Sequence, residues 1–552
     1  MKPGTSRWPG QGRKLWRRLA VAAATCAALT LSTGAPAASG VEPAQSTGEP
    51  AQSTGKPAQD RGVPAKSDWR SAGQNNHNTH HAATERTVGP KNVGRLAPKW
   101  TFTTAGDVSA TPTVVNGTVY VPDWGGKLWA VDADSGKEVW SNTITSYDGI
   151  AGDISRTSPA YWKGDLFIGT GTLMTPEAKS AYLISIDAKT GEKRWKTKVD
   201  DDPTTVITSS PTVDNGVIYV GTSSKASTLH DEPKFRGSVL AIDAKTGKIL
   251  WKTYTLPKGY TGAAVWGSQP VVDHKTGLLF VGTGNNYTSP PGVCLNPKQT
   301  DCTPPDKDNH FDSVLALDLK TGKLKWAHHT LTADTWMMYQ PNQAPDFDFG
   351  SAPNLYTTTI DGKRTDLLGV GQKSGVYYAL EPATGKVVWE TQAGPGGPLG
   401  GILWGTATDG KHIFAGIGNG DHLPYTITAA DGTKTTINSG FFVSLDAATG
   451  EIEWQTADPQ GKDGQWLDDS FVTSANGVMY AGSSAPGGTN MYALDAETGK
   501  IRWDFASGGS VFGGPAVVDG SLYWGSGYYI SNVGEGLSGH NNKLYRFTLD
   551  GR

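Results

Sequence analysis

One eleven-residue pattern recurs along most of this 552-residue chain, and it restricts the possible folds more than any other feature. A short apolar run leads to an acidic residue, a Thr-Gly or Ser-Gly turn follows, and a second short run ends at a Trp. In such a turn the Gly provides positive φ and the acidic side chain caps the backbone. Seven complete copies end at Trp140, Trp195, Trp251, Trp326, Trp389, Trp454 and Trp503. Copies at a spacing of roughly 50–75 residues indicate a repeat architecture.

Further strand-like runs precede each copy, as in residues 110–123, which gives about four strands per unit, the content of a propeller blade. The C-terminal residues 543–552 form an eighth copy that stops at its turn, and residues 96–100 supply a Trp with no turn before it. These two halves are complementary. We therefore predict an all-β, eight-bladed propeller whose last blade is closed by strands from both termini, which leaves no open sheet edge. The repeated Trp side chains are expected to pack between neighbouring blades.

The N-terminus has the pattern of an export signal. A basic region precedes the apolar residues 19–31, and small residues suited to cleavage follow, so we predict a signal peptide over residues 1–38. The apolar run is too short to span a bilayer. Residues 39–66 are rich in Pro, Gly, Ser and Gln and predict a disordered linker. The propeller is then expected over residues 67–552, and the mature protein is expected outside the cell or in the cell envelope or periplasm.

Charge and cysteine content exclude several classes of function. Removing residues 1–38 takes away six basic and no acidic residues, which changes the formal net charge from −3 to −9. A protein this acidic is not expected to bind nucleic acid, and no second apolar segment predicts a membrane span. The sequence holds no C-x-x-C-H haem motif. Cys294 and Cys302, eight residues apart in an exported protein, predict a disulfide that staples a loop.

The repeat resembles the tryptophan-docking motif of quinoprotein dehydrogenases, which carry pyrroloquinoline quinone (PQQ) on the axis of an eight-bladed propeller. The resemblance covers roughly Trp69 to the C-terminus. The same repeat also occurs in propellers that bind no quinone, such as outer-membrane assembly scaffolds and sensor domains. Function must therefore be argued from the site.

The resemblance implies a metal site and a catalytic base. Glu232 in "EPKFRG" and Asn285 in "GTGNNY" match the family's metal ligands, and Asp346 in "APDFDFG" matches its base and a further ligand. A hard divalent cation prefers such oxygen ligands. The resemblance implies Ca²⁺, and a lanthanide stays open because Asp348 lies two residues after Asp346. Asp348 and Asp334 are rival candidates for the base.

The resemblance also implies a cofactor site. Lys373 corresponds to the cation that hydrogen-bonds the reactive quinone oxygen, and it counts with Asp346 as catalytic. The other cofactor-binding candidates are Arg156, Thr208, Ser209, Trp266 and Trp404. Each residue alone could be an ordinary core or turn residue. Their occurrence in the family's order, on successive blades, favours the site. The chain departs from the family in having no vicinal cysteine pair in "DGIAGD" (148–153).

Several stretches, among them "SAGQNNHNTHHAATE" and "GGILWGTATDG", resemble the polyvinyl alcohol dehydrogenase group of this family. That resemblance implies a secreted PQQ-dependent dehydrogenase that oxidises secondary alcohols or polyvinyl alcohol-like polymers by hydride transfer to the quinone. An external acceptor such as a cytochrome c would take the electrons. Two alternatives stay open: a non-catalytic scaffold or sensor, and a quinoprotein that acts on sugars or small primary alcohols. His77, His80 and His81 are interpreted as part of an exposed lead-in segment.

Overall fold

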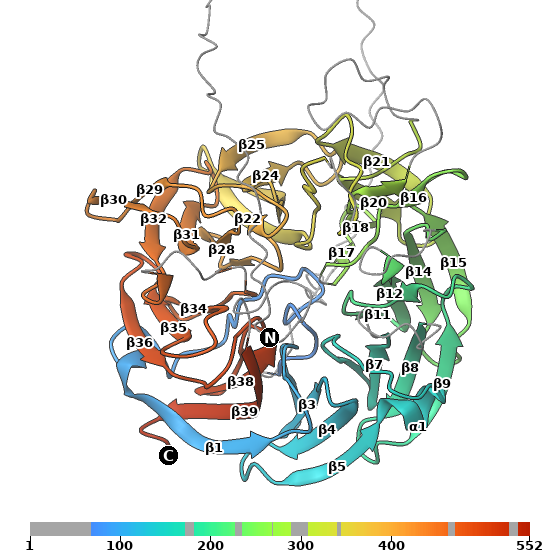
Figure 1. The fold of residues 1–552 in the computed structure, drawn as a ribbon, viewed down its shortest axis with the longest axis horizontal. Helices are drawn as coiled ribbons and strands as arrows, with labels where there is room; N and C mark the ends of the chain where they lie inside the picture. The colour runs from blue at the N-terminus through green and yellow to red at the C-terminus, as the bar shows by residue number, and fades with distance from the viewer. Residues whose placement is uncertain are drawn as a thin grey trace, which may run out of the picture. The chain divides into compact units, whose positions relative to one another are not determined.

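The computed structural model describes residues 68–171, 181–226, 234–267, 269–288, 307–338, 344–461, 468, 470–528 and 539–552, which lie in one compact unit spanning residues 60–552. In these ranges eight antiparallel sheets surround a central axis (Figure 1), which confirms the predicted all-β, eight-bladed propeller. None of the helices in these ranges is long and apolar enough to cross a membrane.

Each blade is a four-stranded antiparallel meander, and blades are numbered here from 1 to 8 in chain order. Blade 1 comprises β2 (Thr113–Val115), β3 (Thr118–Pro122), β4 (Lys127–Asp132) and β5 (Glu138–Thr143), and blade 2 comprises β6 (Ala160–Trp162), β7 (Asp165–Gly169), β8 (Tyr182–Asp187) and β9 (Lys193–Lys198). Blade 3 comprises β11 (Thr212–Asp214), β12 (Val217–Gly221), β14 (Ser238–Asp243) and β15 (Ile249–Tyr254). Blade 4 comprises β17 (Val271–Asp273), β18 (Leu278–Gly282), β20 (Ser313–Asp318) and β21 (Leu324–His329).

Blade 5 comprises β22 (Asn354–Ile360), β23 (Lys363–Gly371), β24 (Val376–Leu380) and β25 (Val387–Gln392). Blade 6 comprises β27 (Ala407–Thr408), β28 (His412–Asn419), β31 (Phe441–Asp446) and β32 (Ile452–Ala457), and the short β26 (Gly400–Gly401) also pairs with β28. Blade 7 comprises β33 (Thr473–Ala475), β34 (Val478–Gly482), β35 (Met491–Asp495) and β36 (Ile501–Phe505), and blade 8 comprises β37 (Ala516–Val518), β38 (Ser521–Tyr528), β39 (Gly539–Leu549) and β1 (Leu96–Thr103). Smaller elements are η1 (Val93–Arg95), α1 (Ile144–Asp148) and the pairs β10 (Thr205–Val206) with β13 (Ser223–Ser224), β16 (Thr261–Gly262) with β19 (Asn286–Thr288), and β29 (Tyr425–Thr428) with β30 (Lys434–Ile437).

The repeated Trp residues join each blade to the next, as predicted. Seven of the eight indoles in the series donate Nε1–H to a backbone carbonyl of the following blade at 2.9–3.2 Å. The Gly of the next turn also packs against the Trp ring, in every case except Trp503. Gly450 shows why only Gly fits: its φ is +77°, and a Cβ there would lie 2.4 Å from the ring of Trp389.

Both chain ends build blade 8. β1 pairs antiparallel with β39 from Leu96↔Leu549 to Thr103↔Lys543, and Trp503 of blade 7 donates to the carbonyl of Leu96 at 2.9 Å. The predicted closure by strands from both termini is therefore confirmed.

Residues 69–85, called the axial strap here, cross the middle of the propeller before β1 begins. They hydrogen-bond to all eight blades in turn. The partners on the blades are Val114, Tyr161, Val213, Val272, Leu355, Thr408, Ser474 and Gly520. Seven of these bonds are made with backbone groups of the blades' innermost strands, and Gly520, in the turn before β38, donates to the Glu85 carboxylate at 2.8 Å.

The strap corrects one expectation. His80 is fully buried, its ring stacks on Phe471 at 5.8 Å, and burial lowers its pKa to about 3. The interpretation of His77, His80 and His81 as part of an exposed lead-in segment is wrong. The reason is that the strap is bonded to the inner strands of the blades, which lie far away in the sequence and which local polarity cannot reveal.

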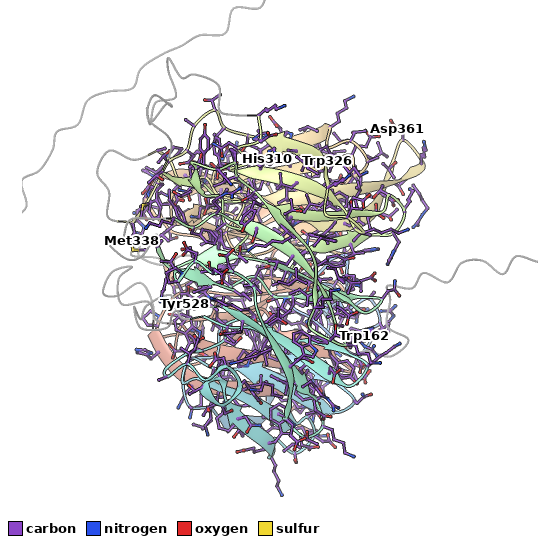
Figure 2. The ribbon with its side chains drawn as sticks, turned by 90° about the vertical axis from the view of Figure 1, so that its right-hand side faces the viewer. Trp162, His310, Trp326, Met338, Asp361 and Tyr528 are labelled. Carbon is purple, nitrogen blue, oxygen red and sulfur yellow. The ribbon has the colours of Figure 1, made fainter. Side chains whose placement is uncertain are left out.

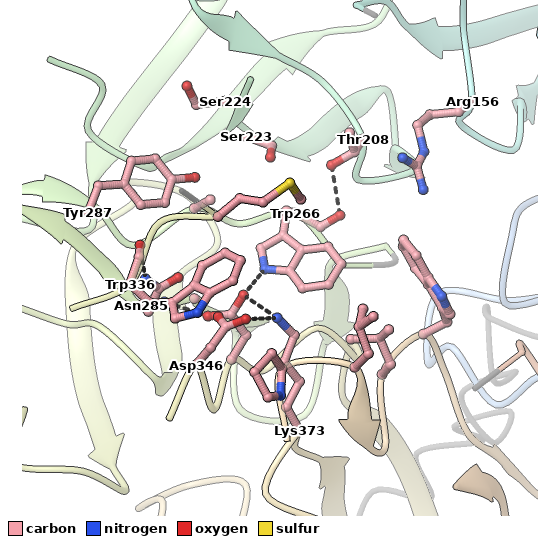
Figure 3. Close-up of a pocket in the computed structure, with 18 of the residues that line it drawn as sticks. Arg156, Thr208, Ser223, Ser224, Trp266, Asn285, Tyr287, Trp336, Asp346 and Lys373 are labelled. Atoms are coloured by element: carbon pink, nitrogen blue, oxygen red, sulfur yellow. Dashed lines mark hydrogen bonds and ion pairs between the residues drawn. The ribbon is translucent and has the colours of Figure 1, made fainter. Parts of the chain in front are cut away.

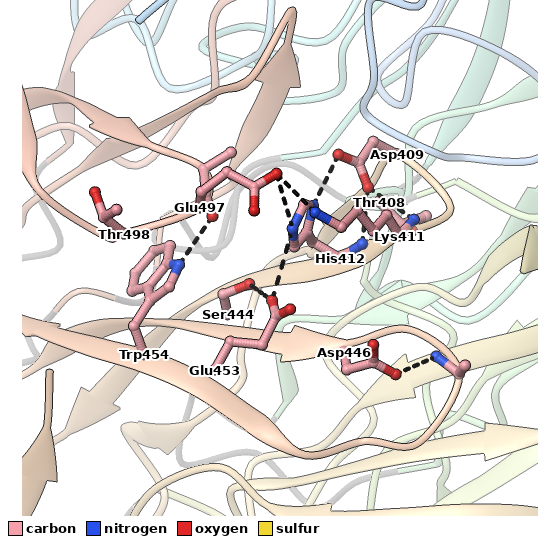
Figure 4. Close-up of polar contacts among 12 residues, drawn as sticks. Thr408, Asp409, Lys411, His412, Ser444, Asp446, Glu453, Trp454, Glu497 and Thr498 are labelled. Atoms are coloured by element: carbon pink, nitrogen blue, oxygen red, sulfur yellow. Dashed lines mark hydrogen bonds and ion pairs between the residues drawn. The ribbon is translucent and has the colours of Figure 1, made fainter. Parts of the chain in front are cut away.

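A charged cluster near the hairpin turns joins blade 6 to blade 7 (Figure 4). His412 Nδ1 lies 3.0 Å from Asp409, and His412 Nε2 lies 3.8 Å from both Glu453 and Glu497. Lys411 Nζ also forms an ion pair with Glu497 Oε1, at 2.7 Å. These carboxylates raise the pKa of His412 although burial lowers it, and the imidazole holds the pKa of Asp409 at about 2 against burial.

Candidate active site

The hairpin geometry of the blades determines where a site can form. The residues just before the first strand of a blade and those just after its second strand lie at the same end of that hairpin. Thr208, Trp266 and Trp404 precede first strands, whereas Asn285 and Lys373 follow second strands. In the side view of Figure 2, Met338 and Tyr528 lie on one face, and Trp162 and Asp361, next to hairpin turns, lie on the opposite one.

These strand ends surround a cavity of about 360 Å³ (Figure 3), which is within the size range of cofactor sites. Much of its wall is apolar or aromatic; Asn285, Asp346 and Lys373 lie on one side, and Thr208 and Arg156 lie on another. The lining residues are Arg156, Thr208, Ser223, Ser224, Ala264, Trp266, Gly284, Asn285, Tyr287, Trp336, Met338, Asp346, Asp348, Lys373, Pro398, Leu399, Leu403, Trp404 and Tyr528.

A buried lysine and two buried aspartates form the charged side of the cavity. Lys373 Nζ lies 2.9 Å from Asp346 Oδ2 and 3.3 Å from Asp348 Oδ2. Burial raises the pKa of Asp346 well above its usual value, the charge of Lys373 opposes this, and the charge of Asp348 adds to it. Burial lowers the pKa of Lys373, but the two carboxylates outweigh burial and raise it overall. The lysine is therefore a permanent cation.

Asp348 orients its neighbours. Its Oδ1 accepts the backbone N–H of Asn285 at 2.6 Å, and its Oδ2 accepts the indole N–H of Trp266 at 2.8 Å. Together with Lys373, three donors therefore occupy this carboxylate. Asp346 accepts the shorter of the two lysine bonds and has fewer competing donors, which makes it the better placed of the two to accept a proton.

Asn285 presents its amide oxygen rather than its nitrogen. Its Nδ2 donates to the carbonyls of Asn286 at 2.6 Å and Trp336 at 2.8 Å. Both amide hydrogens are used in this way, which leaves Oδ1 as the group available to a ligand in the cavity. The Gly-Thr-Gly turn before Asn285 permits the close packing, since a Cβ on Gly284 would lie 2.8 Å from Asp348.

Two further aspartates lie behind this centre. Asp334 accepts the backbone N–H of Phe347 at 2.7 Å and that of Asp346 at 3.2 Å, and burial raises its pKa to about 6. Asp312 is fully buried, and burial together with the charge of Asp334 raises its pKa well above the usual value.

The opposite wall carries a cation among aromatic rings. The Arg156 guanidinium lies 5.1–5.5 Å from the ring centres of Trp124, Trp404 and Tyr528. Trp266 and Trp404 meet edge to face at 5.4 Å. Such rings supply apolar area for a flat ligand, and the guanidinium suits a carboxylate.

The structure brings most of the predicted residues to one cavity. Arg156, Thr208, Trp266, Asn285, Asp346, Lys373 and Trp404 all line it. Ser209 does not line it and is fully buried, because neighbours along an extended segment face opposite sides. Glu232, Cys294 and Cys302 lie outside the described residues. Sequence reasoning did not name Tyr528, Leu399, Trp336 or Met338, and it included Tyr287 only as the last residue of "GTGNNY".

The residues present fit a hard cation and a flat anionic cofactor. The donor set is a carboxylate and an amide oxygen, with two carboxylates facing a single lysine on the charged side. In the described residues no three Asp, Glu, His or Cys side chains are arranged as a metal site by themselves. A complete set of cation ligands in this cavity therefore has to include the amide oxygen of Asn285 and, in addition, a ligand such as Glu232. For a cofactor, the indole walls and Arg156 are of the right chemistry.

Comparison with known proteins yields the following similarities. A PQQ family model, described as the glucose/ethanol/alcohol dehydrogenase β-propeller domain, matches residues 69–396, and one described as outer membrane protein assembly factor BamB matches residues 438–547. A polyvinylalcohol dehydrogenase from Sphingopyxis sp. (strain 113P3) is 32% identical over 83% of this chain and 73% of its own length. A second, from Pseudomonas sp., is 29% identical over 83% and 74%.

Among solved structures, a quinohemoprotein alcohol dehydrogenase from Pseudomonas putida HK5 superposes with a TM-score of 0.66 at 20% identity, covering 88% of this chain and 81% of its own. The quinohemoprotein alcohol dehydrogenase from Comamonas testosteroni gives a TM-score of 0.66 at 19% identity, with the same coverage. At these identities the likeness is one of fold.

Proposed function

Since the chain belongs to the PQQ family of alcohol dehydrogenase propellers, we propose that its axial cavity oxidises an alcohol with PQQ and a divalent cation bound. The chain is a PQQ-dependent alcohol dehydrogenase, and the open questions are which residues act and on which alcohol. The observation that carries the proposal is the convergence of Asn285 from blade 4, Lys373 from blade 5 and Asp346 from the connection between them on one cavity with aromatic walls.

In this proposal the chain holds each group with distinct residues. The amide oxygen of Asn285 and the carboxylate of Asp346 bind Ca²⁺, with Glu232 as a further ligand; a lanthanide is the alternative cation. The faces of Trp266 and Trp404, the Thr208 hydroxyl and the Arg156 guanidinium hold the quinone. Ser209, which does not line the cavity, is left out of this set.

Asp346 acts as the general base, because its carboxylate faces the cavity and is buried where a proton acceptor is strengthened. The charge of Lys373 opposes the effect of burial on the pKa of that carboxylate, and its third N–H is left to donate to negative charge that develops in the cavity. When bound, the quinone accepts the two electrons that leave the alcohol carbon as hydride. The enclosing indoles exclude water from the buried charges.

The substrate proposed is a secondary alcohol or a polymer of the polyvinyl alcohol kind. Both relatives with high coverage are polyvinylalcohol dehydrogenases by name. The cavity wall includes the apolar side chains of Trp336, Met338, Pro398 and Leu399, which favour a hydrocarbon backbone over a sugar. We further propose export through the signal over residues 1–38, and electron transfer to an external acceptor such as a cytochrome c.

The test is reconstitution of purified protein with PQQ and Ca²⁺, followed by assay with a dye acceptor on secondary alcohols, a polyvinyl alcohol, glucose and ethanol. Asp346→Asn should lower kcat by roughly 10²–10⁴-fold, the usual worth of a general base. Asp273→Asn is the matched control, because Asp273 is also a buried aspartate but caps a turn outside the cavity. Absence of quinone binding by the wild type would favour a scaffold or sensor instead. A preference for glucose or ethanol would favour a quinoprotein that acts on sugars or small primary alcohols.

A further inference from the structure

The backbone of Asp346 has an unusual conformation that something must hold. Its φ is +59°, in the left-handed region that a residue with a side chain adopts less readily than Gly. The next residue, Phe347, is not Gly and offers no added freedom. A side chain that aims Asp346 into the cavity from such a backbone therefore needs fixed partners.

Asp334 supplies those partners. Its Oδ1 accepts the N–H of Asp346 at 3.2 Å, and its Oδ2 accepts the N–H of Phe347 at 2.7 Å. Two successive N–H groups thus converge on one carboxylate, which is 1% exposed and does not line the cavity. Asp334 therefore cannot reach a substrate in the cavity.

The backbone beside Asp334 also holds the other proposed ligand. The carbonyl of Asp334 accepts the N–H of Asn286 at 2.9 Å, and the N–H of Trp336 donates to the carbonyl of Asn286 at 2.9 Å. The carbonyl of Trp336 then accepts Nδ2 of Asn285 at 2.8 Å, which turns the amide oxygen of Asn285 toward the cavity. One short segment, residues 334–336, is thus bonded to both Asn285 and Asp346.

We propose that Asp334 is a positioning residue, which fixes the Asp346 carboxylate relative to the Asn285 amide oxygen so that both can bind one cation. This inference rests on the proposed function, because it takes Asn285 and Asp346 as the cation's ligands. Asn at position 334 could satisfy only one of the two N–H groups with its oxygen, and its own NH₂ would face the other. The segment would then lose its hold on Asp346 while Asn285 and Asp346 stay unchanged.

The experiment measures cation binding without turnover. Tb³⁺ stands in for Ca²⁺, and its luminescence is excited through the nearby Trp266 and Trp336 of the full-length apoprotein. Asp334→Asn should raise the dissociation constant for Tb³⁺ by roughly tenfold or more, the usual effect of losing a partner that orients a ligand. Asp458→Asn is the control, since Asp458 is equally buried and accepts from Ser483 and Tyr492 in another blade. Its dissociation constant should stay at the wild-type value.

Activity gives the second readout. With PQQ and limiting Ca²⁺, Asp334→Asn should lower kcat with KM for the alcohol unchanged, and saturating Ca²⁺ should restore much of the loss. Asp334→Ala removes both acceptor oxygens and should show a larger loss than Asp334→Asn, which keeps one. A wild-type dissociation constant in Asp334→Asn, or a loss that saturating Ca²⁺ does not restore, would overturn the proposal; so would failure of both variants to fold. A wild type that binds Tb³⁺ but oxidises no alcohol would instead refute the proposed function.

Discussion

At the scale of single residues, the charge balance around Lys373 governs what Asp346 can do. Lys373 is bonded to two buried carboxylates at once, and its charge is what opposes the effect of burial on the pKa of Asp346. Removing that cation leaves Asp346 and Asp348 as like charges in a site of low polarity. Such a pair takes up a proton rather than stay doubly ionised.

We therefore expect Lys373→Met to raise the pKa of Asp346 further and to leave it protonated at neutral pH. A base must be unprotonated to act, so activity should appear only at higher pH than in the wild type. At pH 7 the loss in kcat should be roughly 10²–10³-fold, the range for removing a group that stabilises developing charge. The measurement is the pH dependence of kcat/KM with PQQ and Ca²⁺ saturating.

Lys373→Arg is the matched variant, because it keeps the cation. Its pH profile should stay near that of the wild type while kcat falls, since the guanidinium fork does not fit a site built for one Nζ. A Lys373→Met profile that keeps the wild-type pH dependence would mean that Asp346 does not act as the base.

The sequence could indicate Trp266, Asn285, Asp346 and Lys373 because each lies in a short linear motif. It could not indicate the parts of the site that depend on folding. The left-handed backbone of Asp346 and the bonds from Asp334 arise between segments that meet only in the propeller. Tyr528 reaches the cavity from blade 8, where no motif resembling a cofactor site precedes it.

At the scale of elements, the Gly of each repeat turn has to meet two structural requirements at once. The turn Gly needs positive φ, and it also needs to be small because the Trp of the preceding blade lies against it. The positive φ could be inferred from sequence, since Thr-Gly turns require it. The contact with the preceding Trp was expected only as general packing between blades.

Two glycines separate these requirements. Gly450 has φ +77° and a would-be Cβ 2.4 Å from Trp389, whereas Gly432, in the turn between β29 and β30, has φ +82° and open space around its Cβ. Gly432→Ala should cost about 1–2 kcal/mol for the backbone alone. Gly450→Ala should cost about 1–3 kcal/mol more, because the indole must move. Denaturant midpoints measure both, and equal midpoints would show that the docking contact contributes nothing.

At the scale of the whole molecule, two devices close the propeller. The pairing of β1 with β39 joins the chain ends on the outside, and the axial strap bonds the innermost strands of the blades on the inside. The first could be predicted because the two partial repeats are complementary. The second could not, because the strap shows no periodicity and its partners are spread over some 400 residues of the sequence, from Val114 to Gly520.

The strap also lies next to the residues that shape the cavity. The N–H of Gly73 donates to Gln269 at 3.0 Å, and Gln269 follows shortly after Trp266. Asn354 donates to the carbonyls of both Asn78 in the strap and Thr406, two residues after Trp404. The strap thus connects the positions of both indole walls.

A chain that begins at residue 93 lacks the strap but keeps every strand of all eight blades, and we expect it to melt at a lower temperature and to bind PQQ weakly or not at all. The inner strands would lose their backbone partners and expose unpaired N–H and C=O groups on the axis. The control is a chain that begins at residue 67, the predicted start of the propeller, which should match the full-length protein in both melting temperature and quinone absorbance. If the chain from residue 93 binds PQQ as tightly as that control, the strap is a covering and the blades alone set the position of Trp266 and Trp404.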